Sequence, residues 1–194
     1  DLESYNFGSP GNLGDYTQPC PKCQRGVYIG FFEEFHGQEI LNGQVPKELL
    51  GRATVGYVKP ILLKEIIPYY DQLVRAFQQK FKDNDFGSSG NRSFASQVET
   101  KARWVATLDE KGRSMGYYAA DPGTSKHGWA VAFDWHDKKG NRKNKEFDSD
   151  EYKWMLENAP NYGFHNPDWA QKGGKRPDEA WHFEWINFSN IIKR

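Results

Sequence analysis

The segment PGTSKHGWAVAFDWH, residues 122–136, places two ionisable side chains on a stretch that otherwise has the composition of a buried strand. A buried imidazole or carboxylate is costly unless something binds it. His127 and Asp134 are seven positions apart, and this odd spacing would put them on opposite faces of one straight strand. We therefore expect His127 on the preceding turn or on a neighbouring strand, from which the two side chains can converge.

The size and charge of the chain limit the classes of protein to consider. Its 194 residues suit one domain, which can bury a core without disulfide staples. The 26 basic and 26 acidic residues cancel, so the chain has no basic excess of the kind that binds nucleic acid. No apolar run reaches the ~18 residues of a membrane span, so neither nucleic acid nor a membrane span is expected.

The clearest helical pattern runs from Lys59 to Phe81. Pro60 suits a first helical turn, whereas Pro68 is expected to kink or split the helix. The expected apolar face consists of Leu62, Ile66, Tyr69, Leu73 and Phe77, at spacings of three and four. This helix is expected to be scaffold.

Further patterns predict two more helices and a final strand. A helix is expected to begin near residues 93–97, and another at Ser149 in SDEYKWMLENA, where acidic residues occupy the first turn. AWHFEWINF alternates as a strand does. This order, read as helices followed by strands interleaved with helices, predicts an α+β fold, with a small antiparallel sheet carrying the site and helices flanking it. Residues 1–30 are rich in Gly, Asn, Pro and Ser, so residues 1–40 are expected to form a loop-rich arm, and residues 41–194 the domain.

The two cysteines, Cys20 and Cys23, lie in CPKC within this arm. Three interpretations stay open for them: a local disulfide or free thiols, half of a zinc site completed by His36 or a partner, and a redox pair.

A second pair, Glu179 and His182 in EAWH, straddles the start of the final strand. A carboxylate three residues before a histidine ligand can reach an attacking water without binding the metal itself. His127, Asp134 and His182 would supply three ligands and leave one tetrahedral position open, which is the pattern of a catalytic zinc site. Each histidine alone is more often structural, and we assign that role to His36, His136 and His165. A serine nucleophile at Ser125 is disfavoured, because no G-x-S-x-G turn is present.

Three segments, taken together, resemble a known family. SGNRSFASQ, PGTSKHGWAVAFD and DEAWHFEW are similar to the three motifs of the D-Ala-D-Ala carboxypeptidase and dipeptidase family of zinc peptidases, which also includes phage L-Ala-D-Glu endolysins. LNGQVPKELL and YGFHNPDW are similar to the family's helical lead-in and to the loop before its third motif. The matching motif positions are Ser89, Gly90, Arg92, Ser93 and Gln97, then Ser125, His127, Ala132 and Asp134, and finally Glu179, Trp181 and His182.

This resemblance implies a role for each matching residue. His127, Asp134 and His182 would hold one Zn²⁺ ion. Glu179 would act as general base and then general acid, and Arg92 would stabilise the developing oxyanion. The residues implied to bind substrate or shape its pocket are Ser125, Gln97 and Trp181.

The sequence departs from the family pattern at three positions. Asn91 replaces an aromatic residue beside the arginine, Ala130 replaces a glycine, and Ala180 replaces a proline before the tryptophan. None of these changes removes a ligand or the base. They put the substrate preference in doubt rather than the activity.

The resemblance implies a zinc metallopeptidase that hydrolyses amide bonds in peptidoglycan stem peptides, first of all a D-Ala-D-Ala carboxypeptidase. A phage endolysin or tail-associated endopeptidase that cuts an L-Ala-D-Glu or cross-bridge bond is the alternative, and a non-catalytic zinc-stabilised wall-binding or virion module is a further one. The expected location is the bacterial cell wall, outside the cell or in the periplasm, or else a phage particle or released lysin. The arm of residues 1–40 offers a docking segment for a larger wall or phage assembly.

Overall fold

A computed structural model gives the fold, and it describes residues 25–28, 39–82, 85–139, 147–174, 178–186 and 192–193. The chain forms two compact units, each built from segments that are distant in sequence. The first unit comprises Asp1–Val45, Arg92–Trp129 and Ser189–Arg194, and the second comprises Pro46–Asn91 and Ala130–Phe188. Cys20, Cys23 and His36 lie outside the described residues, so the three interpretations of the cysteine pair stay open.

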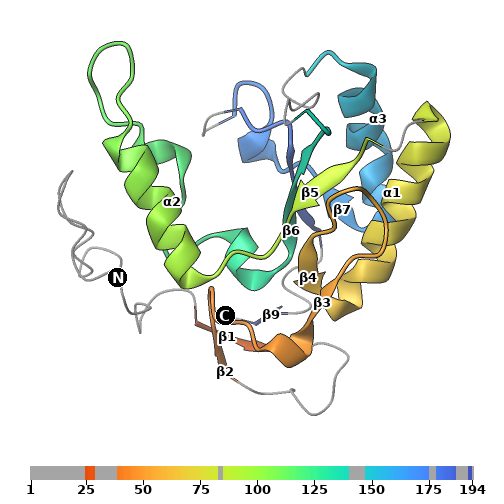
Figure 1. Cartoon of the computed structure of the whole chain (residues 1–194), viewed down its shortest axis with the longest axis horizontal. Coiled ribbons are helices and arrows are strands. Elements are labelled where there is room, and N and C mark those ends of the chain that lie inside the picture. Colours follow the sequence, from red (N-terminus) through yellow and green to blue (C-terminus); the bar gives the residue numbers. More distant parts are fainter. Residues whose placement is uncertain are drawn as a thin grey trace. The chain divides into compact units, whose positions relative to one another are not determined.

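The second unit is organised around a four-stranded antiparallel sheet (Figure 1). Its strand order is β5-β6-β8-β7, with β5 at Gly87–Ser89, β6 at Ala132–His136, β8 at His182–Trp185 and β7 at Phe164–His165. The central pairing of β6 with β8 sets Phe133 opposite Phe183 and Asp134 opposite His182. The expected α+β fold with a small antiparallel sheet is confirmed.

Alternation along these strands gives the sheet two different faces. Phe133 and Phe183 stack with ring centroids 5.8 Å apart on the core face. Helix α1, Ile67–Phe81, covers this face, since Tyr70 meets Phe133 at 5.0 Å and Phe77 meets Trp135 at 5.1 Å, both edge to face. Asp134 and His182 point to the opposite face, which is therefore available for polar chemistry.

The predicted helix over 59–81 is too long. Residues Ile61–Leu63 form strand β4, which pairs with β3 at Leu50–Arg52, and a 3-10 turn (η4) at Lys64–Ile66 leads into α1. Pro68 occupies the first turn of α1, where its missing N–H costs nothing, so the helix begins there instead of kinking. Strands thus precede the helices, contrary to the expected order.

The apolar face of α1 also differs from the expected one. Tyr70 is fully buried, whereas Tyr69 is 44% exposed. With the helix starting at Ile67 and packed on the sheet, Ile66, Leu73 and Phe77 keep their expected buried positions, and Tyr70 replaces Tyr69.

The other helix of the second unit was predicted correctly. Helix α3, Asp150–Asn158, begins at Ser149, whose side chain accepts a hydrogen bond from the amide of Tyr152. Trp154 of α3 packs edge to face on Phe77 with 5.8 Å between ring centroids. In Figure 1, α3 runs beside α1 next to the sheet. Three short 3-10 turns complete this unit: η3 at Lys47–Leu49, η8 at Ala159–Tyr162 and η9 at Asp168–Ala170.

LNGQVPKELL, residues 41–50, was expected to be a helical lead-in. The structure describes all ten residues, and the only helical part of them is the single 3-10 turn η3. Pro46 precedes that turn and the chain enters β3 directly after it, which leaves no length for a helix.

In the first unit, helix α2 at Phe94–Ala106 is confirmed, with Ser93 as the N-cap accepting from the amide of Ser96. Two 3-10 turns follow it, η5 at Gly116–Tyr118 and η6 at Lys126–Trp129. A small sheet of order β2-β1-β9 joins β1 at Arg25–Tyr28 to β2 at Glu39–Leu41 and β9 at Ile192–Lys193. Part of the predicted arm is thus a paired strand, and the boundary at residue 40 stays a prediction.

Ala130 precedes β6 and has a left-handed backbone, with φ of 57°. It is fully buried, and its carbonyl accepts a hydrogen bond from the amide of Leu63 at 3.0 Å. A side chain in this conformation costs about 1–2 kcal/mol, a cost that glycine avoids. This conformation gives a physical reason for glycine at the matching family position.

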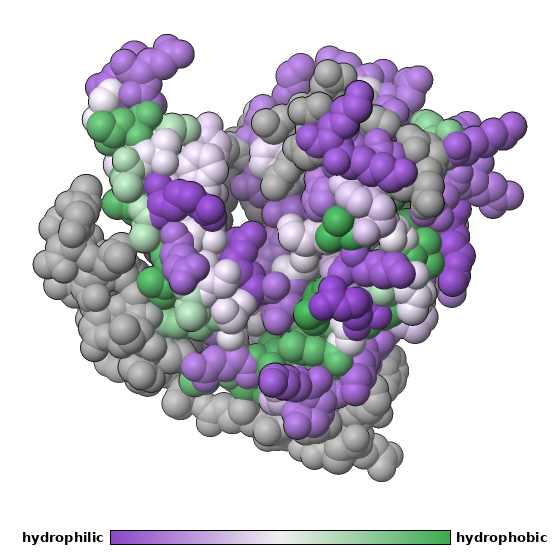
Figure 2. Space-filling model, in the orientation of Figure 1, coloured by the Kyte–Doolittle hydropathy of each residue, from purple (hydrophilic) through white to green (hydrophobic). Residues whose placement is uncertain are grey.

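Hydrophilic residues cover most of the described surface on the face drawn in Figure 2, and hydrophobic ones form small separate groups. No helix among the described residues is both long and apolar enough to cross a membrane.

Substitutions on α1 test its buried face. Phe77→Ala removes a fully packed ring and is expected to lower the free energy of unfolding by about 3–5 kcal/mol. Tyr69→Ala removes a half-exposed ring that meets Trp185 at 5.1 Å, and is expected to cost about 1 kcal/mol. Denaturant unfolding of both variants checks this; equal losses would contradict the assigned face.

Ala130→Gly tests the backbone strain. Relief of the left-handed strain offsets the lost methyl group and the added freedom of the unfolded chain, so stability should stay within ~0.5 kcal/mol of the parent. Ala132→Gly, in the regular strand β6, is the matched control and should lose ~1.5 kcal/mol. Thermal and denaturant unfolding compare the two; a similar loss at both positions would exclude strain at Ala130.

Candidate active site

The buried pair of Asp134 and His182 lies at the centre of the sheet. The two residues are direct partners in the pairing of β6 with β8, and His182 Nδ1 lies 3.1 Å from Asp134 Oδ1. On the other side of the ring, Nε2 lies 3.1 Å from Glu184 Oε2. Burial by itself lowers the pKa of His182, but the hydrogen bonds and charges of Asp134 and Glu184 outweigh it and raise the pKa to about 10.

Glu179 approaches the same ring from the turn before β8. Its Oε2 lies 4.0 Å from His182 Nδ1, the nitrogen that also faces Asp134. The turn is closed by a hydrogen bond from the amide of His182 to the carbonyl of Glu179 at 3.0 Å. Since β8 begins at His182, the expectation that Glu179 and His182 straddle a strand start is confirmed.

His127 lies on the turn η6, not on the strand, so the expected turn position is confirmed. The hydroxyl of Ser125 accepts a hydrogen bond from the amide of His127 at 3.1 Å, and the amide of Arg92 donates to the carbonyl of His127 at 3.0 Å. Asn42 packs against the same turn: a Cβ on Gly128 would fall 2.0 Å from its Oδ1, so only glycine fits there.

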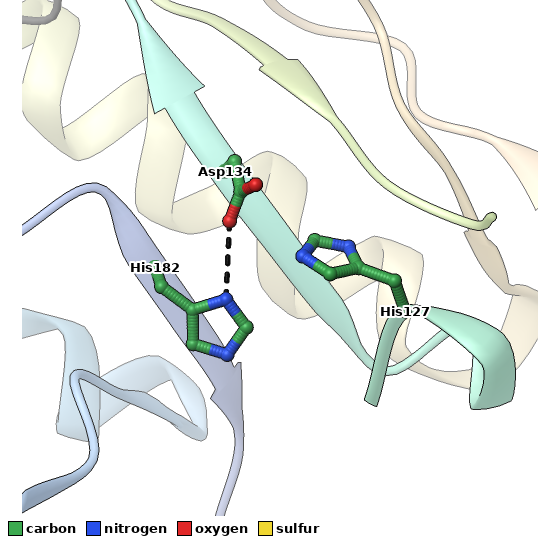
Figure 3. Close-up of side chains that lie close together, drawn as sticks. All are labelled: His127, Asp134 and His182. Carbon is green, nitrogen blue, oxygen red and sulfur yellow. Dashed lines mark hydrogen bonds and ion pairs between the residues drawn. The ribbon is translucent and has the colours of Figure 1, made fainter. Parts of the chain in front are cut away.

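His127, Asp134 and His182 could together hold a metal ion. Each offers one ligand atom, and these atoms lie within 4.8 Å of one another. Figure 3 shows the ring of His127 pointing toward the other two side chains, with the hydrogen bond between Asp134 and His182 drawn. All three are at least nine-tenths buried.

The donor set fits zinc. Two imidazoles and one carboxylate are typical ligands of a catalytic zinc ion, which keeps a further position open. A divalent cation would also balance the buried negative charge of Asp134 and Glu184, which a single imidazolium does not neutralise.

Arg92 is held by Gln97. Its Nη1 donates to Gln97 Oε1 at 2.9 Å, and Gln97 Nε2 donates to the carbonyl of Ala120 at 2.7 Å. Gln97 is 3% exposed, so both ends of its amide are used within the protein. The structure therefore brings Arg92, Gln97 and Ser125 to the neighbourhood of the η6 turn, as their shared motifs suggested.

Asn166 organises the third motif, and sequence reasoning missed it. Its Nδ2 donates to the carbonyls of Glu179 and His182, at 3.1 and 2.7 Å, while Oδ1 accepts from the hydroxyl of Tyr152 at 2.8 Å. An asparagine before a proline in YGFHNPDW has the composition of an ordinary loop. Only the fold shows that it fixes the backbone around Glu179.

Two tryptophans lie beside His182, and sequence reasoning missed the first of them. Trp169 packs on the ring, with 5.0 Å between the two ring centroids. Trp181 extends the pairing of β6 with β8, because its carbonyl accepts a hydrogen bond from the amide of Trp135 at 2.9 Å, and its side chain is partly exposed. The expectation that Trp181 binds substrate stays a prediction.

The structure places the other described histidines outside the candidate ligand set. His136 Nδ1 lies 2.7 Å from the hydroxyl of Tyr57, which agrees with the structural role assigned to it. His165 Nε2 lies 3.9 Å from Glu184 Oε1.

Comparison with known proteins identifies the family. Residues 60–188 match the model of the VanY D-alanyl-D-alanine carboxypeptidase family. No curated protein sequence matches the chain significantly.

Solved structures share the fold at low sequence identity. The LD-carboxypeptidase LdcB is 21% identical, with a TM-score of 0.58 over 74% of this chain and 71% of that one. A mutant of the vancomycin-resistance D,D-pentapeptidase VanY, in complex with Zn(II), is 22% identical, with a TM-score of 0.53 over 73% and 82%. The L,D-carboxypeptidase DacB of Streptococcus pneumoniae is 20% identical, with a TM-score of 0.51 over 85% and 86%.

The family model spans more than half of the chain and includes both strands that carry Asp134 and His182. The resemblance noted in the three motifs is thereby confirmed, and this protein belongs to the VanY D-alanyl-D-alanine carboxypeptidase family of peptidases.

Proposed function

We propose that this protein is a zinc-dependent peptidase that hydrolyses an amide bond in peptidoglycan stem peptides, removing a C-terminal D-Ala. One observation carries the proposal: three ligand atoms of His127, Asp134 and His182 converge, and Glu179 lies at the same ring nitrogen of His182 as Asp134. A metal-binding trio with an adjacent carboxylate is an arrangement suited to metal-assisted amide hydrolysis.

His127, Asp134 and His182 would hold one Zn²⁺ ion. When bound, zinc supplies Lewis-acid chemistry that activates water and polarises the scissile carbonyl. The protein's own task is to keep two imidazoles and a carboxylate in fixed positions, which their burial and backbone hydrogen bonds accomplish.

Glu179 is the proposed general base and acid. At 4.0 Å from His182 Nδ1, its carboxylate is too far to share a hydrogen bond with the ring but close enough to reach a water beside it. It would take the proton of the attacking water and deliver it to the nitrogen of the leaving D-amino acid. The hydrogen bond from Asn166 to the Glu179 carbonyl holds its backbone for this task.

Arg92 is the proposed partner of the developing oxyanion. Gln97 orients its guanidinium through the 2.9 Å hydrogen bond, so Gln97 would act through Arg92 in addition to shaping the pocket. Ser125 supports His127, and with Trp181 it is proposed to line the substrate site.

The family and its structural neighbours support a carboxypeptidase, and those neighbours include both D,D- and L,D-enzymes. A stem pentapeptide ending in D-Ala-D-Ala and a tetrapeptide ending in one D-Ala are therefore the two substrates to compare. Such an activity would operate in the bacterial cell wall, outside the cell or in the periplasm. An endopeptidase of the phage-lysin kind and a non-catalytic wall-binding module are the competing outcomes.

Mass spectrometry of purified peptidoglycan fragments, incubated with and without a chelator, tests the proposal. Chelator-sensitive loss of one terminal D-Ala from the pentapeptide supports a D,D-carboxypeptidase, and loss from the tetrapeptide an L,D-carboxypeptidase. Cleavage inside the stem peptide or the cross-bridge would show that the protein is an endopeptidase and not a carboxypeptidase. Zinc binding without any cleavage would favour the non-catalytic module.

Glu179→Gln is expected to lower kcat about 10²–10⁴-fold, because the amide cannot take up the proton of the attacking water. Zinc content and melting temperature should match the parent protein. Glu157→Gln, at an exposed position of α3, is the matched control and should keep full activity. Turnover retained in Glu179→Gln would remove this residue from the mechanism.

His127→Ala is expected to lower zinc content well below one ion per chain, since two protein ligands hold zinc much more weakly than three. His136→Ala, outside the ligand trio, should bind zinc as the parent does. Elemental analysis after dialysis measures both. Full occupancy in His127→Ala would show that the ligand is misassigned.

A further inference from the structure

Glu184 is a buried carboxylate that the proposed catalytic roles leave unused. It lies on β8 two residues after His182, so both side chains point to the same face of the sheet. It is 8% exposed, and its Oε2 lies 3.1 Å from His182 Nε2. A buried carboxylate is costly unless its charge is compensated, so its retention needs a specific reason.

The two nitrogens of the His182 ring face different partners. Nδ1 faces Asp134 at 3.1 Å and Glu179 at 4.0 Å, whereas Nε2 faces Glu184. Because Asp134 is itself a proposed ligand, Nδ1 is the nitrogen that would meet the ion. Glu184 lies at the far nitrogen, so it is neither a ligand of that ion nor an alternative to Glu179 as base.

The second oxygen of Glu184 also has a neighbour. His165 is its direct partner in the pairing of β7 with β8, and His165 Nε2 lies 3.9 Å from Oε1. Ala132 is its partner on β6, where the small side chain leaves room on this face. The carboxylate is therefore placed by the backbone register and by its 3.1 Å hydrogen bond with His182, while His165 lies beyond hydrogen-bond distance of the second oxygen.

From this geometry we propose that Glu184 is a positioning residue that fixes the tautomer and orientation of His182 for metal binding; the inference rests on the proposed zinc site. An ionised carboxylate only accepts hydrogen bonds, so Nε2 must carry the proton and the Nδ1 lone pair is left for the ion. The negative charge of Glu184 also makes the ring a stronger donor toward the metal. Trp169, packed on the ring, limits its rotation.

The experiment measures zinc affinity by competition with a chromophoric chelator, using the full chain loaded with Zn²⁺. Glu184→Ala is expected to weaken zinc binding about 10- to 100-fold. Glu184→Gln, which keeps an acceptor of the same shape but no charge, should give an intermediate loss and guards against misfolding of the alanine variant. Glu157→Gln on the exposed side of α3 should bind zinc as the parent does.

A second readout reports the tautomer directly. Long-range ¹H–¹⁵N correlation spectra of the zinc-loaded parent should show His182 protonated at Nε2, with slow exchange of that proton. In Glu184→Ala the Nε2 proton should exchange much faster.

The outcomes separate this inference from the proposed function. If the parent protein binds no zinc, both the proposed function and the inference about Glu184 are overturned. If the parent protein binds zinc and Glu184→Ala binds it with the same affinity, the inference alone is overturned. Glu184 then has a purely structural role, even if the variant has a lower melting temperature.

Discussion

The pairing of β6 with β8 is the constraint on which the second unit depends. Its register puts Phe133 against Phe183 and, one step along, Asp134 against His182. The aromatic pair is fixed by burial under α1, and because successive residues alternate, the same register fixes the polar pair on the other face. The free energy of core packing thus also determines the geometry of the candidate site.

Electrostatics decide what the polar face can do. The ring of His182 is buried between Asp134 and Glu184, which together raise its pKa against the effect of burial. A site that holds an imidazole between two carboxylates favours positive charge at its centre, as a metal-binding site must. Asn166 adds a neutral constraint, because its side chain donates hydrogen bonds to the backbone carbonyls of both Glu179 and His182.

The sequence predicts the candidate ligands and base of this site better than it predicts the residues that hold them in place. His127, Asp134, Glu179 and His182 could be named as candidates because their residue types suit a metal site and because their motifs resemble those of the family, and their roles stay predictions. Asn166 and Trp169 could not be named, because an amide and an indole in these contexts also suit loops and surfaces, and only the tertiary fold brings them to His182. Glu184 was missed although strand alternation places it on the same face as His182, which lies two residues before it. Contacts between residues that are distant in sequence thus determine parts of the site that local sequence patterns do not predict.

The fold shows a similar limit. N-caps at Ser93 and Ser149 are short-range signals, and both helices begin where those signals indicate. The start of α1 depended on competition between a helical pattern and the pairing of β3 with β4, which involves residues outside any local window. The left-handed backbone of Ala130 was not predicted either, because a residue other than glycine rarely adopts a positive φ.

The two-faced strands also govern how this chain can change during evolution. Insertions in the segments that connect β6, α3 and β8 leave the parity of each strand intact, so variation in length is tolerable there. A single inserted or deleted residue between Ala132 and Asp134, or between His182 and Glu184, would exchange the two faces and turn phenylalanine toward the site. Within these strands, residues can be substituted, but residues cannot be inserted or deleted. New substrate specificity is therefore expected to arise in the segments around the strands.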